Sequence, residues 1–392
     1  VEAIPLLRCI DPLFTDDVQA RFRKIYNDNK GKAVDILQCR MGLISFIVEK
    51  SELGLKDPIF QEIKVKLPHG DKYTLPEIKK VMLAFVQERE KYYASRKKED
   101  QRFFDSCLAL YEQTLQNDAA KQGYANYQRC LQRVIKAQGD FAVKDEMALC
   151  NRYEINIIQP ALPKEMRAEW KSVRSIIKYV HLKIQGECLG RVVGGLRIQC
   201  HVDMVQSVDF KAVCESSQKK TVVFTSFVDV IERCADVMPK LNLNPLFVSA
   251  KTNKNLNSII RVFEQEEDAN PLVATYASLS TAVPLVMADT MILFDSPFRD
   301  YILQQAVSRI HRLDGDSQTY IYTVSLDTGD EVNISSRSMD ILKWSQSQVE
   351  SILGIKSPFE IKDDLEAFGI ALEGLDEEAI TSAKAAPRYL SW

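Results

Sequence analysis

The sequence predicts an α/β protein in which a parallel β-sheet carries helices on both faces and is preceded by an α-helical region. Two observations lead to this fold class. In the last half of the chain, short apolar runs alternate with amphipathic segments, whereas between about 75 and 150 apolar residues recur every three or four positions. Buried strands separated by helices are typical of a parallel sheet covered on both faces. Functional residues are then expected at the carboxyl ends of the strands.

The first predicted strand lies in "PIFQEIKVKLPHG". Ile59, Ile63 and Val65 give a partial alternation of apolar and polar positions. Pro68 and Gly70 then end the run, so a strand followed by a turn is expected here.

The helical region is predicted from two apolar faces. One is formed by Phe104, Cys107, Leu108, Tyr111 and Leu115, and the other by Tyr124, Tyr127, Leu131 and Val134. A further helix fits "EMRAEWKSVRSIIKYVHLKI", which follows Pro163 at a position suited to a first turn.

The predicted sheet takes its other strands from five apolar runs: "TVVFTSF" (221–227), "PLFVSA" (245–250), "PLVATY" (271–276), "TMILFD" (290–295) and "TYIYTVSL" (319–326). Helices are expected between them in "DVIERCADVMPKL", "LNSIIRVFEQEE" and "DYILQQAVSRIHRL".

Composition limits the function classes. The net charge is -3, from 51 basic and 54 acidic side chains, so any contact with a nucleic acid must be local. The 9 cysteines form no CxxC pair, which indicates reduced thiols and no metal site. No signal peptide and no long apolar run is present, so a soluble intracellular protein without a membrane contact is expected, with nucleus and cytoplasm not distinguished.

The stretch "QQAVSRIHRLDGD" carries the most specific signal. Arg309 and Arg312 lie three residues apart on a predicted helix, so both are expected to project from one helix face. Planar guanidinium groups bind phosphate oxygens in a bidentate way. Gln305, Arg309, His311 and Arg312 match position by position the final motif, Q-x-x-x-R-x-H-R, of the Swi/Snf-type DNA translocases of superfamily 2.

Residues 221 to about 340 therefore resemble the second RecA-like lobe of such a motor. The resemblance implies that Arg309 and Arg312 are arginine fingers and that, with Gln305, they contact ATP. It also implies nucleic-acid contacts by Ser226 in "TVVFTSF" and Lys251 in "FVSAK".

The segment "VATYASLSTAVPLVMAD" occupies the place of the motif that couples nucleotide to DNA, with Thr275, Ser278 and Ser280 as candidates. The family carries a glycine-rich turn and an asparagine there. This chain departs from that pattern, so hydroxyl contacts are the expected substitute for a backbone phosphate cradle.

The same resemblance divides the chain. Residues 1–70 are expected to be the end of a first lobe and a helical protrusion, 71–190 a helical insertion, 191–345 the second RecA-like lobe and 346–392 a tail. The implied partners are double-stranded DNA, bound without sequence preference, the chain's own first RecA-like lobe, and a protein docked on the helical region.

No phosphate-binding loop is recognisable. Gly31 and Lys32 are followed by Ala33, where a serine or threonine is needed. "KDEMA" resembles an acidic helicase box, but a helix start is the preferred interpretation. ATP and Mg²⁺ are therefore expected to be held mainly by a first lobe outside this sequence, and the fragment alone is expected to be inactive.

Two questions stay open at this point. A degenerate RecA-like scaffold that docks proteins is the alternative to a motor, and the altered "SLSTAVPL" favours it, whereas the arginine pair opposes it. The segment "EREKYYASRKKEDQRFF" could stack on and neutralise a nucleic acid, but its interspersed acids favour a solvated helix face with a packed aromatic side.

Overall fold

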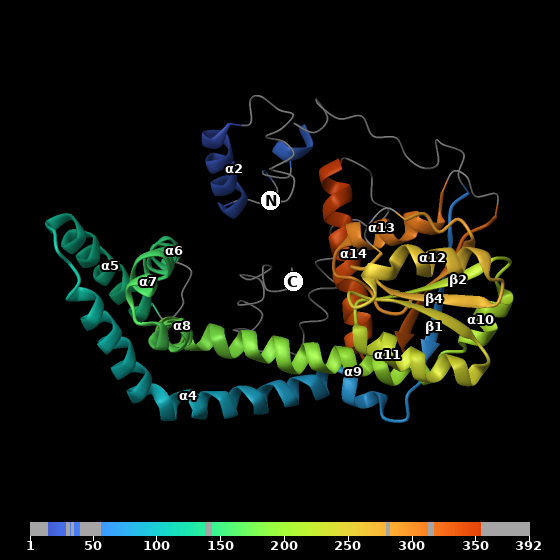
Figure 1. Ribbon diagram of the computed structural model, residues 1–392, viewed down its shortest axis with the longest axis horizontal. Coiled ribbons are helices and arrows are strands. Elements are labelled where there is room, and N and C mark those ends of the chain that lie inside the picture. The colour runs from blue at the N-terminus through green and yellow to red at the C-terminus, as the bar shows by residue number, and fades with distance from the viewer. Residues whose placement is uncertain are drawn as a thin grey trace. The chain divides into compact units, whose positions relative to one another are not determined.

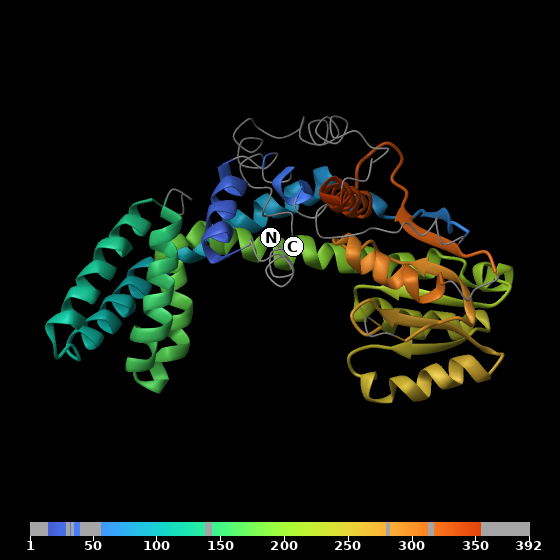
Figure 2. The same ribbon diagram turned by 90° about the horizontal axis from the view of Figure 1, so that it is seen from above.

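The computed structural model describes residues 15–28, 32, 35–39, 56–137, 143–279, 283–312 and 317–353. The chain divides into two compact units. One comprises Val1–Gly70 with Ile198–Trp392 and holds the sheet, and the other, Asp71–Arg197, is helical. Figure 1 labels their elements, and Figure 2 shows the same ribbon turned by 90°. The predictions for 1–14, 40–55 and 354–392 lie outside the described residues.

The first unit contains a six-stranded sheet in the order β1-β6-β5-β2-β4-β3, with every pair parallel. Its strands are β1 (Ile59–Val65), β2 (Lys220–Thr225), β3 (Asn244–Val248), β4 (Ala269–Thr275), β5 (Ala288–Leu293) and β6 (Tyr320–Leu326). The predicted strands and the predicted parallel sheet are confirmed.

The edge strand β1 comes from a distant part of the chain. Its residues pair in register with β6, from Ile59 opposite Tyr320 to Val65 opposite Leu326. The alternation at 59–65 predicted a strand but gave no basis for this partner.

Helices cover both faces of the sheet. Val222 and Phe224 of β2 share a core with Phe263 of α12 (Leu256–Gln265) and Val307 of α13 (Asp300–Ile310). Against the opposite face pack α10 (Phe210–Ser216) and α11 (Val228–Val237), as Figure 1 shows. Because side chains alternate across a strand, β2 and β5 are buried on both sides. The described part of this unit also contains α2 (Asp16–Asp28), a short helical segment at 35–39 and α14 (Ile334–Leu353), and α9 (Gly194–Met204) spans its boundary.

The helical unit is built from α4 (Leu75–Glu112), α5 (Asp118–Lys136), α6 (Lys144–Tyr153), a π-helical turn (Glu154–Ile158), α7 (Gln159–Ala161), α8 (Lys164–Glu187) and a second π-helical turn (Cys188–Val193). Both predicted apolar faces lie in its core, where the Phe104 and Trp170 rings stack with centroids 5.0 Å apart. "KDEMA" starts α6, as expected. Among the described residues, no helix is long and apolar enough to cross a membrane.

Candidate functional site

The predicted arginines lie around the end of α13. This helix ends at Ile310, and His311 has an extended backbone with φ -90° and ψ 93°. Arg309 therefore belongs to the last turn, whereas Arg312 lies beyond the helix. The expectation that both project from one helix face is wrong, because the buried His311 leaves the helix and its Nε2 lies 2.8 Å from the Lys56 carbonyl oxygen.

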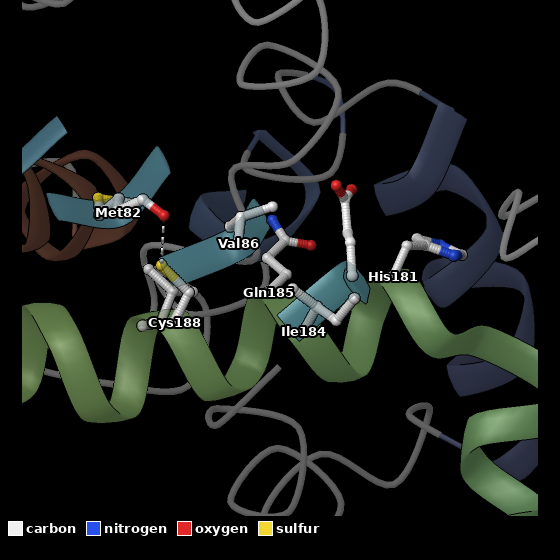
Figure 3. Close-up of a pocket in the computed structure, with 8 residues that line it drawn as sticks. Met82, Val86, His181, Ile184, Gln185 and Cys188 are labelled. Carbon is white, nitrogen blue, oxygen red and sulfur yellow. Dashed lines mark hydrogen bonds between the residues drawn. The ribbon is translucent and has the colours of Figure 1, made fainter. Parts of the chain in front are cut away.

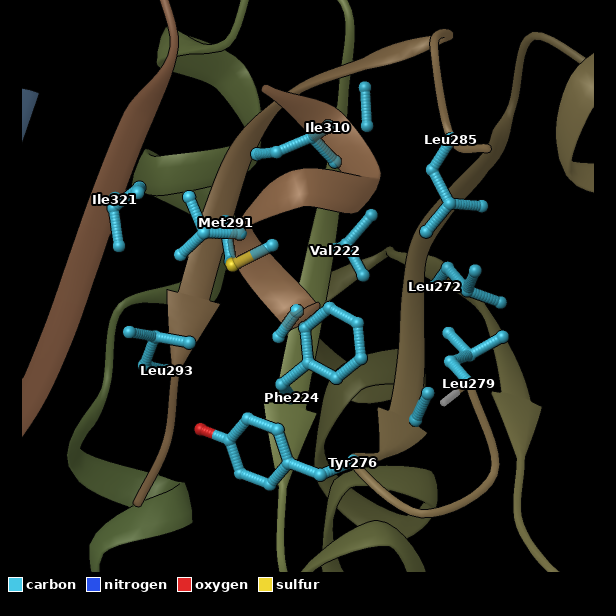
Figure 4. Packing of buried hydrophobic residues seen from close by; sticks show 14 of the residues in the cluster. Val222, Phe224, Leu272, Tyr276, Leu279, Leu285, Met291, Leu293, Ile310 and Ile321 are labelled. Atoms are coloured by element: carbon cyan, nitrogen blue, oxygen red, sulfur yellow. The ribbon is translucent and has the colours of Figure 1, made fainter. Parts of the chain in front are cut away.

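This end of α13 lies at the amino-terminal edge of the sheet. The Leu285 amide, three residues before β5, donates to the Arg309 carbonyl oxygen over 2.9 Å. Lys56, the partner of His311, likewise precedes β1. Figure 4 shows Leu285 and Ile310 at one end of the strands and Tyr276 at the other, toward which the arrows point. The arginines are thus not at the carboxyl ends, where functional residues were expected.

The amino-terminal edge of the sheet around Arg309 and Arg312, the arginine edge, is electrostatically suited to bind an anion. Burial lowers the pKa of Arg309, and the positive charge of Arg312 lowers it further. Two guanidinium groups that repel one another are stabilised by a shared anion such as a phosphate. Gln305 lies one turn before Arg309 on the same helix and is exposed.

The other candidates gather at the carboxyl edge, around the buried Asp295 that follows β5. Its carboxylate accepts from the Thr225 hydroxyl over 2.7 Å and from both the amide and the hydroxyl of Ser226 over 2.5 Å each. Tyr276 donates to its main-chain oxygen over 2.7 Å. Asp295 thereby joins the ends of β5, β2 and β4. It was not predicted as a site residue, although an acid directly after an apolar strand was the available signal.

These bonds limit what Ser226 can do. A serine hydroxyl has one hydrogen, and Ser226 donates it to Asp295. Toward solvent its oxygen can only accept, and a phosphate diester has no hydrogen to offer. In this arrangement the hydroxyl of Ser226 is not placed to donate to a phosphate backbone.

Thr275 and Ser278 are also engaged. Both are buried, at 6% and 4% exposure, and their hydroxyls hydrogen-bond to each other over 2.7 Å. Ser280 lies outside the described residues.

Lys251, in contrast, is exposed just after β3. It pairs with the equally exposed Glu232 over 3.2 Å. Such a surface pair contributes little to stability, so the ammonium group can exchange it for a phosphate.

The candidates therefore form two groups rather than one. The arginines lie at the amino edge of the sheet, and the other group, Ser226, Lys251, Thr275 and Ser278, lies at the carboxyl edge. The two edges are one strand length apart, roughly 20 Å for the 6 residues of β5 at 3.3 Å per residue.

A pocket of about 190 Å³ in the helical unit contains none of them. It lies between α4 and α8 and is lined by Met82, Val86, Glu90, His181, Ile184, Gln185, Cys188 and Leu189 (Figure 3). Burial lowers the pKa of His181.

Residues 202–314 match the family described as "Helicase conserved C-terminal domain". Two uncharacterized ATP-dependent helicases, of Mycoplasma genitalium and Mycoplasma pneumoniae, are each 27% identical over 109 residues, which is 28% of this chain and 11% of their own length. The chain thus spans about a tenth of the relatives it matches.

Among solved structures, the C-terminal part of the Fun30 ATPase domain is 15% identical, covering 76% of this chain and 97% of that one, with a TM-score of 0.39. T4 UvsW is 13% identical, covering 39% and 34%, with a TM-score of 0.32. Every predicted site residue falls within the helicase match at 202–314.

Proposed function

We propose, from the match of residues 202–314 to the helicase conserved C-terminal domain, that the chain is the C-terminal part of a superfamily 2, Swi/Snf-like ATP-dependent DNA translocase or helicase. The observation that carries the proposal is the motif of Gln305, Arg309, His311 and Arg312, held at one edge of a parallel sheet. The proposal that the motor is of the Swi/Snf-like type rests on that motif.

In this proposal Arg309 and Arg312 stabilise the charge that develops on the γ-phosphate of ATP. Their mutual repulsion and the partial burial of Arg309 favour an anion at this edge. ATP and Mg²⁺ are held mainly by another RecA-like lobe, because no phosphate-binding loop is recognisable in the sequence. The arginines complete the pocket only when the two lobes close.

The carboxyl edge is proposed to follow the DNA backbone. Lys251 supplies an exposed cation there, and its ion pair with Glu232 can be exchanged. Contacts to phosphates carry no sequence information, so binding is expected to be sequence-independent and salt-sensitive.

The test uses the longer protein that contains the other lobe. Arg309→Ala and Arg312→Ala are each expected to lower turnover by about 10³-fold or more. The KM for ATP should change far less, because ground-state binding depends chiefly on the other lobe. Arg312→Lys should stay closer to alanine than to the unaltered protein, since an ammonium group lacks the guanidinium fork.

A protein-docking scaffold is the second candidate. It is favoured by the hydroxyls of Thr275 and Ser278, which bond to each other in a buried turn. Near-normal turnover by both alanine variants would place the scaffold ahead of the motor.

A further inference from the structure

The basic residues of α4 in the helical unit differ in how they are neutralised. Arg89 pairs with Glu187 over 2.7 Å, Arg96 with Asp100 over 3.2 Å, and Lys80 with Glu77 over 2.5 Å. Within the described part of the chain, Lys91, Lys98 and Arg102 form no ion pair, and all three are exposed. The structure thus separates paired cations, of which Arg89 joins α4 to α8, from cations that face solvent without an ion pair to the described residues.

Lys91, Lys98 and Arg102 share one side of the helix, whereas the exposed Lys97 lies on another side. At about 100° per residue, Lys91, Ser95, Lys98 and Arg102 fall within about 60° of one another. The buried Tyr93, Phe104 and Cys107 lie on the opposite side, so this stripe faces away from the core. It extends for about 16 Å at 1.5 Å per residue.

Arginine and tyrosine contacts surround this part of α4 on the sides away from the stripe. The Arg89 guanidinium lies 4.3 Å from the centroid of the Tyr92 ring, and Arg96 donates to the Tyr92 hydroxyl over 2.9 Å. Arg89 and Tyr93 both donate to Glu187 of α8. Arg89 and Tyr93 thus attach α4 to α8 on the side of the helix opposite the stripe.

We propose that the stripe of Lys91, Lys98 and Arg102 is a second nucleic-acid contact, which binds the phosphate backbone of duplex DNA. The proposal rests on the proposed function, which supplies the DNA. A row of cations about 16 Å long can meet several phosphates, because each strand of B-DNA carries one charge per about 3.4 Å of helix axis. Charge complementarity, rather than the chain's net charge of -3, drives this contact.

The experiment compares two triple variants of the 392-residue chain that change the net charge equally. Lys91→Ala/Lys98→Ala/Arg102→Ala removes the stripe. Lys97→Ala/Lys136→Ala/Lys171→Ala removes three exposed lysines that lie off the stripe and that form no ion pair with the described residues, Lys97 on another side of α4 and the other two on α5 and α8. Binding of a fluorescent duplex DNA is measured by anisotropy over a range of salt concentrations, and folding is checked by thermal melting.

The stripe variant is expected to bind about tenfold more weakly or worse at low salt. The slope of log K against log salt should fall in magnitude by about 2 to 3, at roughly 0.9 per lost phosphate contact. The control variant should keep the slope of the unaltered chain to within about 0.5, and both should melt like it, because exposed unpaired side chains contribute little to stability.

Equal behaviour of the two triple variants would overturn the stripe but leave the proposed function intact. Failure of the unaltered chain to bind duplex DNA at low salt would overturn both. Binding of the unaltered chain to anionic lipid vesicles but not to DNA would assign the stripe to a membrane surface and equally contradict the proposal.

Discussion

At the residue scale, Asp295 has the largest consequence for the carboxyl edge. One buried carboxylate collects a threonine hydroxyl, a serine hydroxyl and a main-chain amide from the end of β2. Hydrogen bonds to an ionised acceptor are stronger than neutral ones. Ser226 therefore serves the stability of this edge in the arrangement described.

Ser226→Ala is expected to lower the free energy of unfolding by about 1.5 to 3 kcal/mol, because it removes a donor to a buried carboxylate. DNA affinity should change little. Urea denaturation and DNA titration of the same preparations measure the two effects.

Ser216→Ala is the control, since that exposed hydroxyl donates to the Val213 carbonyl oxygen of its own helix. It should stay within about 0.5 kcal/mol of the unaltered chain. A Ser226 variant with unchanged stability and weakened DNA binding would show that the hydroxyl donates to DNA instead.

At the element scale, periodicity predicted most of the structure. The alternation of apolar runs and amphipathic segments located β2 to β6, and the apolar/polar alternation at 59–65 located β1. It misplaced the end of α13, because no glycine or proline marks it. The helix stops where His311 reaches the Lys56 carbonyl oxygen, a contact between residues 255 positions apart that no local pattern contains.

The link between α4 and α8 depends on the charge of Glu187. Burial alone would raise the pKa of this carboxyl, but hydrogen bonds from Tyr93 and Arg89 more than offset burial, and the pKa is lowered. A depressed carboxyl pKa adds stability above the unfolded value, about 4.3, and this stability is lost as pH falls through the lower folded value.

Glu187→Gln should therefore destabilise the chain at pH 7 and have a smaller effect at an acidic pH below the lowered folded pKa, where Glu187 is protonated in the folded chain as well. Urea denaturation at the two pH values measures this difference. An equal loss at both would mean that the carboxylate charge contributes nothing to the link.

At the scale of the whole molecule, the helicase motif identified the candidate residues but not their arrangement. Arg309 and Lys251 were predicted from short segments, and both lie within the helicase match. They lie at opposite edges because α13 runs back along the sheet, from the carboxyl end of β5 to its amino end. The segment that carries the cation stripe on α4 was considered from the sequence, where its interspersed acids favoured a solvated helix face, because only the structure shows which of its basic residues are already paired.

The opposite placement of these residues implies that the two edges can be disabled separately. A change at the arginine edge should lower the rate of ATP hydrolysis without changing the affinity for DNA. A change at the carboxyl edge should do the reverse, because about 20 Å of sheet lies between them.

The most direct test measures DNA-stimulated ATP turnover and nucleotide-free DNA affinity on the same preparations of the longer protein, unaltered and with Arg312→Ala or Lys251→Ala. We predict that Arg312→Ala lowers turnover by about 10³-fold or more while DNA affinity stays within about twofold. Lys251→Ala should weaken DNA binding and reduce the salt slope by about 1, with turnover at saturating DNA nearly unchanged. Loss of DNA affinity in Arg312→Ala, or turnover that survives it, would contradict this account.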